Sequence, residues 1–133
     1  MNEVALIEAL EACTLPPPEF PHRAHVQAAW QYLRLAPFGE AGDRFCAALR
    51  RFATASGASG KYHETITWAY LALINERRAA MPVDDFASFA SANPDLVDHR
   101  SGALSRLYDS ETLASDLARR VFLLPRARHV GEK

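Results

Sequence analysis

Residues 62–80, which read YHETITWAYLALINERRAA, decide the fold of this chain. From Ile66 to Ile74 the stretch is apolar on nearly every side, and strongly polar residues return only at 75–78. A helix that is apolar almost all round is stable only when other elements cover it on several sides. The sequence therefore predicts a long helix over residues 62–80, the longest of the chain, at the centre of a helical bundle.

The apolar residues outside this stretch also recur at helical spacing, and none alternates as in a strand. Val4, Ile7 and Leu10, for example, stand at three-residue steps near the N-terminus. We expect further helices over residues 2–13, 21–35, 40–56, 84–90 and 110–122, and shorter helical turns around Leu96 and Leu104. The sequence thus predicts an all-α fold, a single compact bundle of about five to seven helices.

The 133 residues have the length of one ordinary domain, so we expect a single helical domain over 1–133. Four prolines within residues 14–21 predict a stiff extended connector after the first helix. Gly57 is expected to end the third helix in the left-handed conformation. The basic and polar tail, residues 125–133, is predicted to fray, and His99 and His129 are expected to face solvent.

Composition excludes several classes of partner. Lys and Arg total 15 against 16 for Asp and Glu, a formal charge of -1, so the chain lacks the basic excess that nucleic-acid binding requires. No segment is long and apolar enough to span a bilayer, and the N-terminus lacks the pattern of a signal peptide. We therefore expect a cytoplasmic protein whose partner is a small-molecule substrate or ligand. A homodimer is among the assemblies that the sequence allows.

The two cysteines, Cys13 and Cys46, are not in a C-x-x-C arrangement. Each stands inside an apolar helical pattern, where a thiol behaves as a small buried hydrophobic group. We therefore expect free thiols in preference to a disulfide.

His22 and His25 stand three residues apart at the start of a predicted helix, so their Cβ atoms lie about 5–6 Å apart on one face. That spacing lets two imidazoles bind one metal ion. The partial positive charge of a helix N-terminus also disfavours imidazolium and keeps the neutral, ligating form available. Two ordinary surface histidines at this spacing are the alternative interpretation.

His63 and Glu64 open the predicted central helix, directly after a Gly-rich turn. A carboxylate at a helix N-terminus is favourable, which explains Glu64 but not His63. The Thr67 hydroxyl, one turn later, can support the imidazole or bond its own i−4 carbonyl, and the second is commoner. Because one helix separates the second from the fourth, both should start at the same end of the bundle, where His63 would meet His22 and His25.

Three imidazole nitrogens with one open position are typical of a catalytic metal site. We therefore predict a small metal-dependent enzyme with His22, His25 and His63 as ligands. Zinc and iron are both compatible with such ligands. His63 and Glu64 are the expected catalytic residues. Glu64, or Glu19 as the alternative to it, is expected to serve as general acid or base or as a fourth metal ligand. The residues expected to line the substrate pocket are Tyr32, Tyr62, Thr67 and Tyr70.

Two alternatives from other classes stay open. The first is a metal-free enzyme in which His63 and Glu64 act as general acid and base. The second is a non-catalytic helical module that binds a ligand or a partner. The zinc-protease motif H-E-x-x-H is broken, because Thr67 stands where its second histidine would be.

The pattern F-P-H-x-x-H-V-x-x-A-W-x-Y-L over residues 20–33, followed by K-Y-H-E-T-I-T-W-A over 61–69, resembles an uncharacterised group of small bacterial helical proteins. Residues 108–110 and 122–125 resemble that group as well, so the likeness spans most of the chain. The resemblance implies no particular activity. It favours the interpretation that both histidine motifs belong to a working site.

Overall fold

The computed structural model describes residues 2–98 and 102–126, and every regular element in those ranges is a helix. The predicted all-α class is confirmed. The elements in chain order are α1 (Glu3–Glu11), η1 (Pro17–Glu19), α2 (His22–Leu35), α3 (Phe38–Ala55), η2 (Ser59–Lys61), α4 (Glu64–Ala80), α5 (Phe86–Ala92), α6 (Pro94–Val97), η4 (Ala103–Arg106), α7 (Ser110–Ala114) and α8 (Asp116–Arg120).

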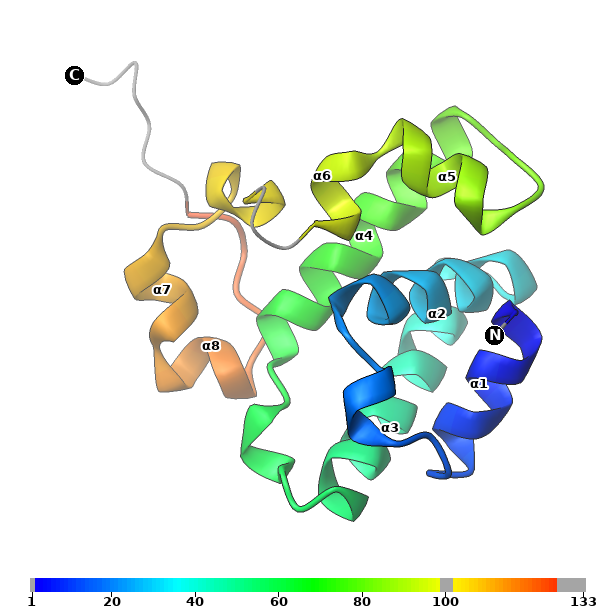
Figure 1. The fold of residues 1–133 in the computed structure, drawn as a ribbon. Coiled ribbons are helices and arrows are strands. Elements are labelled where there is room, and N and C mark those ends of the chain that lie inside the picture. The colour runs from blue at the N-terminus through cyan, green and yellow to red at the C-terminus, as the bar shows by residue number, and fades with distance from the viewer. Residues whose placement is uncertain (1, 99–101, 127–133) are drawn as a thin grey trace.

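The helix α4 runs through the middle of the molecule, with α1, α2 and α3 on one side and α7 and α8 on the other (Figure 1). Leu71 and Ile74 are fully buried in the larger apolar core, which α1, α2, α3, α5 and α6 share. Ala69 belongs instead to a smaller core with Tyr108 and Ala118. Since α4 contributes to both cores, its predicted central position is confirmed. Its predicted rank as longest helix is wrong, because α3 has 18 residues and α4 has 17.

The helices α3 and α4 approach each other closely at Gly42. A Cβ atom placed on Gly42 would lie 2.3 Å from the ring of Trp68, which is far inside van der Waals contact. Glycine is therefore the residue that lets the Trp68 ring lie against the backbone of α3. This contact fixes the spacing of the two helices beside the pocket described below.

Two helices end in the same C-terminal motif. Gly57, with φ of 71°, follows α3, and the backbone N–H groups of Gly57 and Ala58 bond back to the carbonyls of Thr54 and Ala53. The predicted left-handed end of the third helix is confirmed. Cys13, with φ of 57°, takes the corresponding place after α1 and is the one non-glycine residue with positive φ in the described ranges.

The prediction of a single helix over residues 110–122 is wrong. Ser115 has extended backbone, with φ of −73° and ψ of 151°, so it ends α7 and its hydroxyl accepts a hydrogen bond from the Ala118 N–H to begin α8. A serine hydroxyl at this place competes with continued helix. The proline-rich connector is also less extended than predicted, because it contains the 3-10 turn η1 (Pro17–Glu19).

None of the helices that the structure describes is both long and apolar enough to cross a membrane. Cys13 and Cys46 are free thiols, as expected. The predictions for His99, His129 and residues 127–133 of the tail lie outside the described residues.

Candidate functional site

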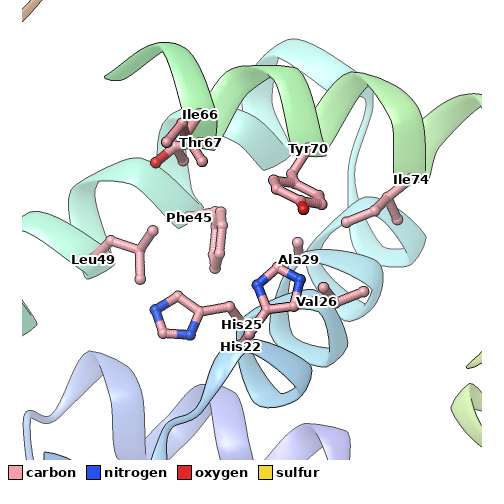
Figure 2. A pocket seen from close by; sticks show the side chains of 10 residues that line it. All are labelled: His22, His25, Val26, Ala29, Phe45, Leu49, Ile66, Thr67, Tyr70 and Ile74. Atoms are coloured by element: carbon pink, nitrogen blue, oxygen red, sulfur yellow. The ribbon is translucent and has the colours of Figure 1, made fainter. Parts of the chain in front are cut away.

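A pocket lies between α2, α3 and α4, and its cavity volume is about 90 Å³ (Figure 2). Most of its surface is apolar, and among the described residues that line it none is an aspartate, glutamate, lysine or arginine. The lining residues are His22, His25, Val26, Ala29, Phe45, Leu49, Ile66, Thr67, Tyr70 and Ile74.

The imidazole of His25 is held in one orientation and one tautomer. Its Nδ1 lies 3.0 Å from the carbonyl oxygen of Pro21, one helical turn earlier. A carbonyl only accepts, so Nδ1 carries the proton and Nε2 presents a lone pair. Phe20 stacks on the ring with centroids 3.9 Å apart and an interplanar angle of 26°. These two contacts fix Nε2 as a hydrogen-bond acceptor.

Burial lowers the pKa of His25 below its ordinary value of 6.5, and the nearby His22 lowers it further. The hydrogen bond to Pro21 opposes this change without cancelling it. Loss of hydration disfavours the charged form of a histidine, so the imidazole stays neutral near pH 7. Burial thus favours the neutral imidazole, which carries the single proton that the contact with Pro21 places on Nδ1.

The second imidazole of the pocket, His22, connects α2 to α6. Its Nε2 donates to the carbonyl oxygen of Leu96 over 2.8 Å. The edge of one ring meets the face of the other between His22 and Tyr70, with centroids 5.0 Å apart. In Figure 2 the ring nearer to Tyr70 is therefore that of His22. These contacts place His22 at the wall of the pocket and give it a structural role there.

Two side chains of α4 complete the polar part of the lining. Thr67 donates its hydroxyl proton to the carbonyl oxygen of His63, 2.7 Å away, which is the i−4 bond that the sequence favours. The hydroxyl of Tyr70 points from α4 toward α2 in Figure 2 and has no hydrogen-bond partner within residues 2–98 and 102–126. Burial raises the pKa of Tyr70, so the hydroxyl keeps its proton.

The predicted three-histidine metal site is wrong. In the part of the chain that the structure describes, no group of three or more His, Cys, Asp and Glu side chains is arranged to hold a metal ion. His22 and His25 line the pocket, but His63 does not. The metal-dependent enzyme predicted from the sequence, with zinc or iron as its cofactor, falls with this site.

His63 misses the pocket because both of its ring nitrogens bond to other parts of the chain. It is the N-cap residue of α4, and its Nδ1 accepts from the backbone N–H of Ile66 at 3.1 Å. Its Nε2 donates to the carbonyl oxygen of Leu113 at 2.7 Å. The ring therefore lies against α7, and neither nitrogen can bind a metal or exchange a proton with a substrate without losing a backbone partner.

Glu64, predicted as the general acid or base, bonds to Tyr62 and Arg50 instead of reaching the pocket. The Tyr62 hydroxyl donates to its Oε1 over 2.6 Å, and the guanidinium of Arg50 lies 3.6 Å from the same oxygen. The Arg50 side chain is 54% exposed, so we assign this contact little stabilisation. Glu19, the alternative general base, lies in a separate hollow beside Arg23.

Of the four residues predicted to line a substrate pocket, the structure brings Thr67 and Tyr70 to the pocket. Tyr62 lies beside Glu64, outside the lining. Tyr32 is fully buried in the main core, where its hydroxyl donates to Glu11 over 2.5 Å. Burial and the acceptor Glu11 raise the pKa of Tyr32, so it too keeps its proton.

The sequence did not single out the residues that α3 contributes to the pocket. Phe45 and Leu49 are four residues apart and share the apolar face that α3 turns toward α4. Such spacing is typical of ordinary core residues, and nothing in the sequence separates a core residue from one that lines a cavity.

Comparisons of the chain with protein-family models, with curated proteins and with solved structures find no match. The resemblance drawn from the histidine motifs stays a prediction, and the pocket has to be interpreted from its own chemistry.

Proposed function

We propose that this protein binds a small organic molecule in the pocket between α2, α3 and α4. One observation carries the proposal. The cavity is largely apolar, yet Nε2 of His25 and the hydroxyl of Tyr70 have no hydrogen-bond partner among the residues described. Apolar clefts with a few polar groups that fix orientation are the usual form of a small-molecule site.

The cavity volume limits the size of the molecule that can enter. At about 90 Å³ it is smaller than an apolar cavity of about 150 Å³, which takes up benzene. The enclosed ligand, or the enclosed part of a larger one, is therefore about the size of a five-membered ring. Apolar walls such as Val26 and Ile74 favour a compact hydrocarbon portion.

The other polar groups of the lining already have partners. Thr67 donates to the carbonyl of His63, and His22 donates to that of Leu96. A ligand is thus directed to the two groups that lack one, His25 and Tyr70. Two polar groups without a partner among the described residues, on an apolar wall, distinguish this pocket from a packing gap in the core.

The proposal is tested by titrating ¹⁵N-labelled protein with furan and pyrrole, two five-membered rings of nearly equal size. We expect amide shifts confined to the lining, for instance at Ala29, Thr67 and Tyr70. The variant Ala29→Leu fills the cavity and should abolish the shifts. Ala72→Leu makes the same change at an exposed place on α4 and should leave them intact.

A larger side chain in a packed interior costs about 1–3 kcal/mol, so each variant is first checked for its folded spectrum. Leu49→Phe is a second filling variant in case Ala29→Leu does not fold. The proposal is overturned when neither ring shifts the lining amides of the wild-type protein. It is equally overturned when the shifts persist in a folded filling variant.

A further inference from the structure

We infer that the pocket selects neutral molecules that donate an N–H or O–H hydrogen bond, with Nε2 of His25 as the acceptor that decides between ligands. The inference rests on the proposed function and adds the chemical class of the ligand. It stands on the tautomer of one imidazole and on the uncharged character of the lining that the structure describes.

The first support is the fixed direction of the His25 ring. Because the carbonyl of Pro21 can only accept, its partner Nδ1 must carry the single proton of the neutral imidazole. The stacked ring of Phe20 opposes rotation about the side-chain bonds, which would carry Nδ1 away from the carbonyl of Pro21. Because the proton is on Nδ1, Nε2 can only accept a hydrogen bond. A ligand with an N–H or O–H group can donate to it.

The second support is that, among the residues described, an anion finds no counter-charge in the pocket. None of the lining residues within 2–98 and 102–126 is lysine or arginine, and His25 is uncharged near pH 7 because burial lowers its pKa. A carboxylate would lose hydration against walls such as Ile66 and Phe45, and it would place its own lone pairs against that of Nε2. Anions are therefore disfavoured twice.

A cation is disfavoured by the same composition, since no aspartate or glutamate of the described part of the chain lines the pocket. An ammonium group needs several strong acceptors to replace its hydration, and His25 offers one. The hydroxyl of Tyr70 can either donate or accept, so it tolerates both kinds of group on the far side of the ligand. Neutral donors such as azoles, amides and alcohols are the class that this set of groups fits.

Two matched pairs of probes test the inference at pH 7.5. Pyrrole and furan differ in whether the ring heteroatom donates, and cyclopropanecarboxamide and cyclopropanecarboxylate differ in charge at nearly constant shape. One net hydrogen bond corresponds to about three- to tenfold in affinity. We expect pyrrole to bind about three- to tenfold more tightly than furan. The amide should bind where the carboxylate gives no saturable shift.

The variant His25→Phe keeps the ring against Phe20 but removes the acceptor, so it should bind pyrrole and furan equally. Tyr70→Phe removes the other hydroxyl and should keep the preference for pyrrole. Equal binding of the two rings by wild-type protein, or binding of the carboxylate as tight as that of the amide, overturns the inference and leaves the proposed function standing. Failure of every probe to bind overturns both. The wild-type pairs decide the class of ligand, and the two variants decide which group accepts its hydrogen bond. A folded His25→Phe protein that still prefers pyrrole also overturns the inference, as does a folded Tyr70→Phe protein that loses the preference.

Discussion

The Nε2 of His63 donates to the carbonyl oxygen of Leu113 across 2.7 Å, and the two residues are separated by 50 positions in the chain. The other ring nitrogen caps α4 by accepting from Ile66. One side chain therefore both begins the central helix and fastens α7 against it. The favourable charge of a helix N-terminus does not explain a histidine at position 63, but these two hydrogen bonds do.

The first prediction concerns this double role. Replacing His63 by alanine removes the cap and leaves the Leu113 carbonyl without its partner, so we expect a loss of about 2–3 kcal/mol in the free energy of unfolding. His63→Asn keeps a side-chain acceptor for the Ile66 N–H and should recover about 1 kcal/mol of that loss. Urea unfolding followed by circular dichroism measures both.

The same pair of variants separates a structural role for His63 from a role in ligand binding. Binding of pyrrole to the folded His63→Asn protein should equal that of the wild type, because the ring does not line the pocket. A large loss of binding without a loss of stability would show that the structural interpretation is incorrect.

Thr65 supplies the second prediction. It is fully buried, its hydroxyl donates to the carbonyl oxygen of Val121 at 2.8 Å, and it accepts from the N–H of Leu123 at 3.1 Å. Thr65→Val keeps the shape but leaves two backbone groups unpaired. Each such group costs about 1–3 kcal/mol, so the variant should be destabilised by at least about 2 kcal/mol.

The control for this change is Thr65→Ser, which keeps the hydroxyl and loses one methyl group. Its expected cost is about 1 kcal/mol. If serine at this place proves as damaging as valine, the hydrogen bonds to the C-terminal segment are not what makes Thr65 important. Urea midpoints of the two variants, measured with the wild type, decide this.

The helices could be predicted from the sequence because each is a local pattern. The apolar row from Ile66 to Ile74 fixed the central helix, and Gly57 correctly marked the end of α3. The break at Ser115 was missed because Leu113 and Leu117 continue a helical spacing on either side of it. Side-chain hydrogen bonds to the backbone decided that boundary, and apolar spacing carries no information about them.

The site could be predicted only in part, for a related reason. The sequence correctly placed His22 and His25 together on one helical face, and the structure brings Thr67 and Tyr70 to them. It could not show that His63 turns toward Leu113, because that partner is 50 residues away. Histidine spacing reports which rings share a helix face, whereas a ring's direction depends on the groups that the fold brings near it.

The third prediction concerns Cys13, which occupies the left-handed position after α1. An L-residue in that conformation is strained by about 1–2 kcal/mol, and glycine escapes the strain but loses more chain entropy on folding. Cys13→Gly should therefore raise the free energy of unfolding by about 0.5–1 kcal/mol. Differential scanning calorimetry of the reduced protein measures the gain.

The opposite substitution at Gly57 is the control. Gly57 holds the same place after α3, and a Cβ atom there would meet nothing within 4 Å. Gly57→Ala should lower the stability by about 1 kcal/mol through the backbone alone. A Cys13→Gly protein less stable than the wild type would mean that packing of the half-buried thiol outweighs the strain.

The last prediction is a pH dependence that comes from His25. Burial lowers its pKa in the folded protein below the ordinary value of 6.5, whereas the unfolded chain keeps that value. The unfolded state therefore binds more protons below pH 6.5, and stability falls as the pH decreases from 6.5 through the folded pKa. One proton contributes at most about 1.4 kcal/mol per pH unit, and solvent screening of the partly exposed ring reduces this.

This pH dependence is isolated by comparing wild-type protein with His25→Phe, which keeps the stacking on Phe20 but cannot titrate. Urea unfolding at pH 8, 7, 6 and 5 should give two curves whose difference is constant above pH 7. Below pH 6.5 the wild type should lose stability relative to the variant, because only the wild type has a His25 that must take up a proton. A difference that stays constant down to pH 5 would assign the acid sensitivity to other groups, and Nε2 of His25 would then lack the buried surroundings that make it a selective acceptor.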